Sequence, residues 1–163
     1  MELNDSLKVN MFRYSPWPGN VLSNFAATPF ILDGINCSCS EAFIQSLKCS
    51  STQEQKEFCG LSGLEAWEKG SSLTDLVFLE KKIWWLGKTY PLHSKEHFEL
   101  VERGLRAKFS QSSIALEALV ATGNSKLIHD YGQKQGKKQS LPVEIFCSIV
   151  DQIRTDIREQ YNA

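Results

Sequence analysis

The sequence lacks long hydrophobic runs. A helix needs roughly 18 apolar residues in a row to span a membrane, and no such run occurs. The first ten residues, MELNDSLKVN, also lack the basic segment and apolar stretch of a secretory signal peptide. We therefore expect a cytoplasmic protein without a membrane-spanning segment.

A disulfide framework is also missing. The five cysteines are odd in number and irregularly spaced, whereas small extracellular domains carry even, ordered sets. Cys37 and Cys39 are too close together to form half of a zinc knuckle, and no second pair follows them. We expect the cysteines to be small buried apolar residues in a reducing compartment.

The chain has no excess of either charge. Its 18 basic and 19 acidic residues leave a net charge of −1. Binding along a nucleic-acid backbone depends on clustered positive charge, so extended nucleic-acid binding is not expected. A few Lys and Arg side chains can still hold one phosphate, which leaves a small phosphorylated ligand as a candidate partner.

What the sequence does have is enough apolar material for one core. Of its 163 residues, 42% are apolar and 23% charged, which is typical of globular domains. We found no internal repeat and no long Pro/Gly/Ser linker. We therefore expect a single domain over 1–163, with a core at about 12–160.

Strands are predicted in the first forty residues, which are rich in turn residues. Asp33-Gly34 lies between two short apolar runs, and Asp-Gly favours a β-hairpin because both turn positions tolerate positive φ. The segment around KVNMFRY alternates in part between apolar and polar residues. Two or three strands are expected here.

Helices are predicted from Ser40 onward, where apolar residues recur with helical spacing. Ser40 is expected to cap the first helix, and Thr52 and Ser62 the next two. Gly60 and Gly70 stand where helices commonly end. Further helices are expected at 75–85, 95–109 behind Ser94, 114–122 and from Pro142 onward, with a strand at 126–131. The predicted class is α+β, mostly helical, with a small N-terminal antiparallel sheet and several short helices.

Three polar residues share one face of the first predicted helix. Glu41, Gln45 and Lys48 follow at i, i+4 and i+7. Glu41 also falls in the first turn, where the helix dipole favours a charged carboxylate at neutral pH. The same spacing is common on a solvated helix face, so the stripe alone does not identify a site.

Four segments in order resemble the NADAR (YbiA-like) family, and together they span most of the chain. The segments are LSNF at 22–25, SEAFIQSLK at 40–48, RGLRAKF at 103–109 and ATGNSKLIH at 121–129. The resemblance implies a small α+β N-glycosidase that acts on ribose-phosphate conjugates and needs no metal or redox cofactor. Implied substrates are phosphoribosyl-aminopyrimidines of riboflavin synthesis, and ADP-ribose attached to guanine, free or in DNA.

The resemblance also assigns roles to individual residues. Glu41 takes the position of the family's catalytic carboxylate, with Gln45 and Lys48 beside it in the pocket. The matched segments further implicate a group of residues in contacts with ribose and phosphate: Asn24, Arg106 and Lys108.

This chain departs from the family's pattern at three places. Ala42 replaces a common His, and His93 stands where members often place a Trp, which makes it a candidate substrate contact. A tail motif of Trp-Gly followed by Asp is here Tyr131-Gly132-Gln133. Asp130 would then supply the second acid, or it caps a turn. Tyr131 would stack on the base, or it belongs to the core.

Other patterns were considered. His93-Ser94-Lys95-Glu96-His97 matches the H-x-x-E-H metalloprotease signature, but capping by Ser94 would leave His93 outside the helix. The basic segment 134–138 would wrap a phosphate or form a solvated turn. The main alternative to a glycosidase is a binder of ADP-ribose or a related nucleotide that does not cleave it. A small interaction protein with exposed tryptophans is a third interpretation.

Overall fold

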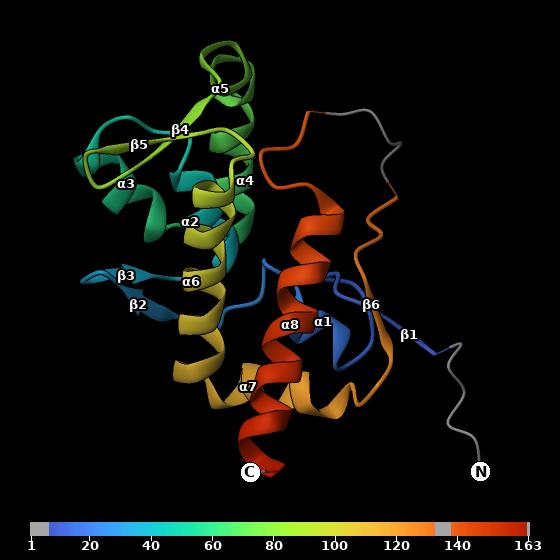
Figure 1. Ribbon diagram of the computed structural model, residues 1–163. Helices are drawn as coiled ribbons and strands as arrows, with labels where there is room; N and C mark the ends of the chain where they lie inside the picture. Colours follow the sequence, from blue (N-terminus) through green and yellow to red (C-terminus); the bar gives the residue numbers. More distant parts are fainter. Residues whose placement is uncertain (1–6, 133–137, 163) are drawn as a thin grey trace.

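The computed structural model describes residues 7–132 and 138–162. Within these ranges the chain forms eight helices and six short strands, which confirms the predicted α+β, mostly helical class. Figure 1 shows helices α6 (Lys95–Gln111) and α8 (Val143–Asn162) beside each other in the middle of the molecule. The region from α2 to β5 lies on one side of this pair, and β1 and β6 lie on the other.

The strands pair in three two-stranded sheets. The antiparallel hairpin of β2 (Phe30–Leu32) and β3 (Ile35–Cys37) confirms the prediction from Asp33-Gly34, because both turn residues have positive φ, 50° and 81°. The second sheet is parallel and joins β1 (Lys8–Asn10) to β6 (Lys126–Ile128). It brings two segments from near opposite ends of the chain together.

The third sheet corrects one prediction. The segment 75–85 is not one helix: α5 (Thr74–Glu80) ends at Lys81, whose φ of 57° is left-handed, and β4 (Lys82–Trp85) follows. β4 pairs with β5 (Lys88–Pro91) in an antiparallel hairpin. A short apolar run such as Ile83-Trp84-Trp85 suits a buried strand as well as a helix, so its spacing did not reveal the break.

Several helix caps differ from the predicted ones by one residue. Cys39 rather than Ser40 caps α2 (Ser40–Ser46), since its Sγ accepts a hydrogen bond from the amide of Ala42. Likewise Ser51, not Thr52, caps α3 (Thr52–Cys59). Because Ser40 does not cap the helix, its hydroxyl can point into the buried interior.

Other local predictions are confirmed. Ser62 and Glu65 form a capping box at the start of α4 (Gly63–Ser71), and Gly60 ends α3. Gly70, however, lies inside α4 rather than at its end. The remaining helices have the predicted positions within one to two residues: α6 behind the cap Ser94, α7 (Ser113–Ala121) and α8.

Helix α2 lies at the centre of the fold, and all of its residues are buried. It packs against α3, α4 and α6. A Cβ on Gly104 of α6 would lie 2.3 Å from the ring of Phe43, so the contact between α6 and α2 needs a glycine there. The polar residues of α2 are therefore not on a solvated helix face.

A further helix, α1 (Gly19–Leu22), follows β1 and contacts both β1 and α7. Within the described part of the chain, no helix is long and apolar enough to cross a membrane.

Candidate functional site

A pocket of about 670 Å³ opens along one side of α2. One wall comes from α2, α4, the start of α5 and the segment before α2. The opposite wall comes from the loop after β1, the segment after β6 and the start of α8. Its lining includes Asn24, Glu41, Gln45 and Lys48, together with the aromatic residues Phe12, Tyr14, Phe25, Trp67, Tyr131 and Phe146.

Glu41 holds the central position among the polar groups. Its side chain is anchored by Gln45, whose Nε2 donates a 2.8 Å hydrogen bond to Oε1. Its backbone amide donates to the carbonyl of Asn24 at 2.9 Å. Glu41 is only 8% exposed, and this burial raises its pKa despite the Gln45 hydrogen bond and the nearby charge of Lys48. The expected effect of the helix dipole does not set the direction of the shift, because desolvation is larger.

Lys48 lies in the same pocket but is bound to protein groups. Its Nζ donates to Thr74 Oγ1 at 2.8 Å and to the carbonyl of Gly70 at 3.3 Å. Burial lowers its pKa to about 8, while the charge of Glu41 acts in the opposite direction. The ammonium therefore connects the segment that follows α2 to α4 and α5.

Asn24 and Lys108 belong to one buried network at the N-terminus of α2. Ser40 Oγ donates to Asn24 Oδ1 at 2.9 Å, and Lys108 Nζ lies 3.5 Å from the same hydroxyl and 3.4 Å from the carbonyl of Ser23. Asn24 lines the pocket. Lys108 does not: it is 1% exposed, and burial lowers its pKa to about 8. Lys108 therefore supports the pocket wall from behind.

Besides Lys108, three further sequence-predicted residues do not line this pocket. Arg106 makes ion pairs with Glu102 at 3.0 Å and with Asp156 at 2.5 Å. His93 adopts a positive φ of 62° and its Nε2 lies 2.9 Å from the carbonyl of Gln139. Both side chains thus have protein partners and lie outside the pocket lining.

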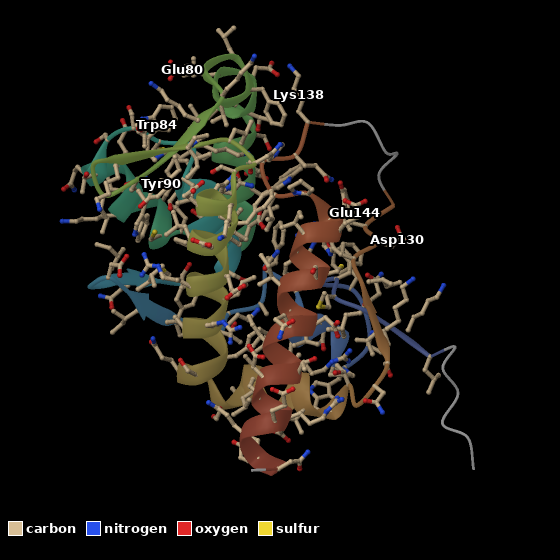
Figure 2. All side chains as sticks on the ribbon, viewed as in Figure 1. Glu80, Trp84, Tyr90, Asp130, Lys138 and Glu144 are labelled. Carbon is tan, nitrogen blue, oxygen red and sulfur yellow. The ribbon has the colours of Figure 1, made fainter. Side chains whose placement is uncertain are left out.

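Asp130 is the third residue outside the pocket. Its carboxylate accepts a 3.0 Å hydrogen bond from the amide of Gly132, and its backbone pairs with the side chain of Asn10. Figure 2 shows it beyond β6, on the side of α8 away from α5. The geometry matches the turn-capping interpretation and does not provide a second acid in the pocket.

Tyr131 does line the pocket. Its ring lies 5.1 Å from that of His129, and its hydroxyl accepts a hydrogen bond from Gln139. Gln133 and residues 134–137 of the basic segment lie outside the described residues. Lys138 is described, and its Nζ lies 3.3 Å from Asp75 at the start of α5 (Figure 2).

The H-x-x-E-H pattern has a structural explanation in the cap of α6. Ser94 Oγ accepts from the amide of His97, and His97 Nδ1 accepts from the amide of His93 at 3.0 Å. Among residues 7–132 and 138–162, no three His, Cys, Asp or Glu side chains are grouped so as to hold a metal. Four of the five cysteines, including Cys37 and Cys39, are buried.

Several pocket residues were missed from the sequence. Trp67 and Tyr14, which are 47% and 73% exposed, line the pocket but were not singled out from the sequence as site residues. Arg13 and Thr74 were not considered. The only signal for Arg13 was its place within the aromatic segment Phe12-Arg13-Tyr14, which does not by itself indicate a pocket.

Comparisons with known proteins agree with this architecture. The chain matches the family described as Bacteriophage protein GP30.3 over residues 16–155. It is 29% identical over 142 residues to the uncharacterized 17.1 kDa protein in the Gp30-rIII intergenic region of Enterobacteria phage T4, which covers 86% of this chain and 93% of that protein. The fold is similar to the NMR structure of the E. coli protein YbiA, with a TM-score of 0.67, 20% sequence identity and coverage of 96% of this chain and 88% of that one.

These matches confirm the resemblance that the four sequence segments indicated. The chain belongs to the bacteriophage GP30.3 family, a NADAR-like family, and has the fold of YbiA.

Proposed function

We propose that this protein hydrolyses the N-glycosidic bond between a ribose phosphate and a nitrogenous base. The ribose phosphate would be ADP-ribose or a 5-phosphoribosyl group, and the base a guanine or an aminopyrimidine. The observation that carries the proposal is the carboxylate of Glu41, fixed by Gln45 in a pocket of nucleotide size. Ligand pockets commonly have volumes of about 300 to 1,000 Å³.

The reaction needs a group such as Glu41. When the bond between C1 of ribose and nitrogen breaks, its electron pair leaves with the base, which takes up a proton, and positive charge develops on the ribose ring. A carboxylate close to the ring stabilises this charge. Water then forms the new C1–O bond and gives a proton to the carboxylate, which passes it to the nitrogen of the departing base, so that Glu41 returns to its ionised form. Because burial raises the pKa of Glu41, it becomes a stronger proton acceptor.

The pocket offers surfaces for the rest of such a substrate. The exposed faces of Tyr14 and Trp67 supply rings on which a base would stack. Asn24 lines the pocket next to Glu41, and its Nδ2 makes no hydrogen bond with the described residues, so it is available to a ribose hydroxyl. Stacking and hydrogen bonding would orient C1 towards the carboxylate.

The direct test is an assay for released ribose phosphate. The protein is incubated with ADP-ribosylated guanine and, separately, with a phosphoribosyl-aminopyrimidine. We expect release from at least one of them. Absence of product from both, with protein shown to be folded by circular dichroism, would contradict the proposed hydrolysis.

One observation favours a second candidate, a binder of ADP-ribose without hydrolysis. Asp130, the residue expected to supply a second acid, binds Gly132 in a turn outside the pocket. Calorimetry with ADP-ribose, combined with the release assay, separates the two functions. A binder shows affinity without release, whereas an enzyme shows both, and only the enzyme loses an activity on Glu41→Gln.

A further inference from the structure

A substrate that carries phosphate needs a cationic side chain in the pocket. The two cations predicted from the sequence, Arg106 and Lys108, do not line it. Arg106 is held by two carboxylates, and Lys108 lies behind the pocket wall. Three basic side chains line the pocket among the described residues: Arg13, Lys48 and Lys138. These three side chains are the candidates for binding a phosphate group.

Two of the three are already engaged. Lys48 is 6% exposed and donates to Thr74 and Gly70. Lys138 lies within 3.3 Å of the carboxylate of Asp75. Arg13, in contrast, makes no hydrogen bond or ion pair with any residue in 7–132 or 138–162, and it is exposed at the pocket.

Two aromatic rings hold Arg13 in place. Its guanidinium carbon lies 4.6 Å from the ring centre of Tyr14 and 5.0 Å from that of Phe25. Contact with ring faces stabilises a guanidinium and leaves the N–H donors, which lie in its plane, free for another partner. Such a fork matches two oxygens of a phosphate.

Packing fixes the ring of Phe25, whereas Tyr14 is 73% exposed and has one edge contact with Phe12. Phe25 lies so close to α4 that a Cβ on Gly63 would come within 2.9 Å of it. Tyr14 meets Phe12 edge to face, with ring centres 5.4 Å apart. Arg13 is therefore held on a preorganised support, which reduces the entropy lost when a ligand binds.

The same support continues to the proposed catalytic carboxylate. Phe25 follows Asn24 in the chain, and the carbonyl of Asn24 accepts from the amide of Glu41 at 2.9 Å. Through its contact with Phe25, the cation of Arg13 therefore adjoins the segment that carries the ribose-facing amide of Asn24 and contacts Glu41. Resting on the function proposed above, we propose that Arg13 binds the phosphate of the substrate and makes the pocket select ribose phosphates over unphosphorylated nucleosides.

Calorimetry with ADP-ribose and adenosine tests this selection without requiring turnover. We expect Arg13→Gln to weaken ADP-ribose binding by about tenfold to a hundredfold, the effect of losing a charged hydrogen-bonding partner, and to leave adenosine binding unchanged. Arg13→Lys keeps the charge but loses the two parallel N–H donors. Its affinity for ADP-ribose should lie between those of the wild type and Arg13→Gln. Arg158→Gln is the matched control, because Arg158 binds Asn124 and Gly123 away from this pocket.

The outcomes separate this inference from the proposed hydrolysis. Loss of ADP-ribose affinity in Arg13→Gln supports the role of Arg13 even where the wild type releases no product. Unchanged ADP-ribose affinity in this variant, an equal loss for adenosine, or a wild type that does not bind ADP-ribose overturns it. Because Arg13 is exposed and packs only on ring faces, the variant should fold, which its melting temperature and the Arg13→Lys variant check.

Discussion

The side-chain amide of Gln45 donates to the carboxylate of Glu41, and Gly70 on the neighbouring helix leaves room for it. A Cβ at Gly70 would lie 1.9 Å from Gln45 Oε1 and 2.7 Å from its Cδ. α4 therefore packs closely against the Gln45 side chain, which in turn positions the carboxylate of Glu41. A glycine with ordinary helical backbone angles is explained here by close packing, not by its conformational freedom.

Gly70→Ala should lower both stability and turnover. The added methyl displaces the Gln45 side chain, and overpacking of this kind costs about 1 to 3 kcal/mol, partly offset by the better helix propensity of Ala. Urea unfolding and the product-release assay measure the two effects. Gly60→Ala is the control, since its Cβ would meet nothing closer than 3.6 Å. Equal behaviour of the two variants would contradict the packing argument.

Gln45→Met should shift the pH dependence of turnover. Met has a similar shape but donates no hydrogen bond, and the Gln45 hydrogen bond lowers the Glu41 pKa. Loss of the hydrogen bond raises the pKa of Glu41 further. The fall of kcat/KM at acid pH, which reflects protonation of Glu41, therefore moves to higher pH. Gln152→Met on exposed α8 surface serves as control. An acid limb that stays in place would show that Glu41 ionisation does not control the rate.

Local sequence signals predicted the hairpin at Asp33-Gly34, the capping box of Ser62 and the cap at Ser94. Each of these features depends on residues only a few positions apart, so the local sequence is enough to predict it. The cap of α2 was displaced to Cys39 because Ser40 is required in the interior, where it binds Asn24. Tertiary contacts decided that position.

The pocket was predictable only in part. Glu41, Gln45 and Lys48 could be found because they lie close together in a segment that resembles a known family, although only Glu41 and Gln45 are on α2 and Lys48 follows its end. The opposite wall depends on the parallel pairing of Val9 with Leu127, which no local pattern reveals. The sequence does not distinguish Arg106 from Arg13 as a ligand of phosphate. The structure shows that Arg106 is ion-paired, whereas Arg13 has no ion pair with the described residues.

Arg106→Gln should leave turnover within about twofold of the wild type. Arg106 binds Glu102 and Asp156 on partly exposed surface, and such pairs contribute about 1 kcal/mol or less to stability. Steady-state kinetics and thermal unfolding check both expectations. A tenfold loss of kcat/KM at unchanged melting temperature would return Arg106 to the substrate site. Asp130→Asn is expected to behave in the same way.

Lys108 gives a prediction for stability as a function of pH. Burial lowers its pKa in the folded state to about 8, below the ordinary lysine pKa of 10.5, so the folded state binds fewer protons than the unfolded state between these values. The penalty of the buried charge is full below about pH 8 and disappears as pH rises to 10.5. Over this range the wild type should gain about 3 kcal/mol of unfolding free energy relative to Lys108→Met. A constant difference from pH 7 to 10.5 would exclude the lowered pKa.

The central claim is that Glu41 acts on the substrate and does not merely support the fold. The most direct measurement compares Glu41→Gln with the wild type in single-turnover release of ribose phosphate and in calorimetry with ADP-ribose. We predict a loss of turnover of about 100-fold to 10,000-fold, the usual contribution of an acid–base group, with ADP-ribose affinity retained within about threefold. Turnover that survives the substitution in a folded, ligand-binding protein would contradict the account.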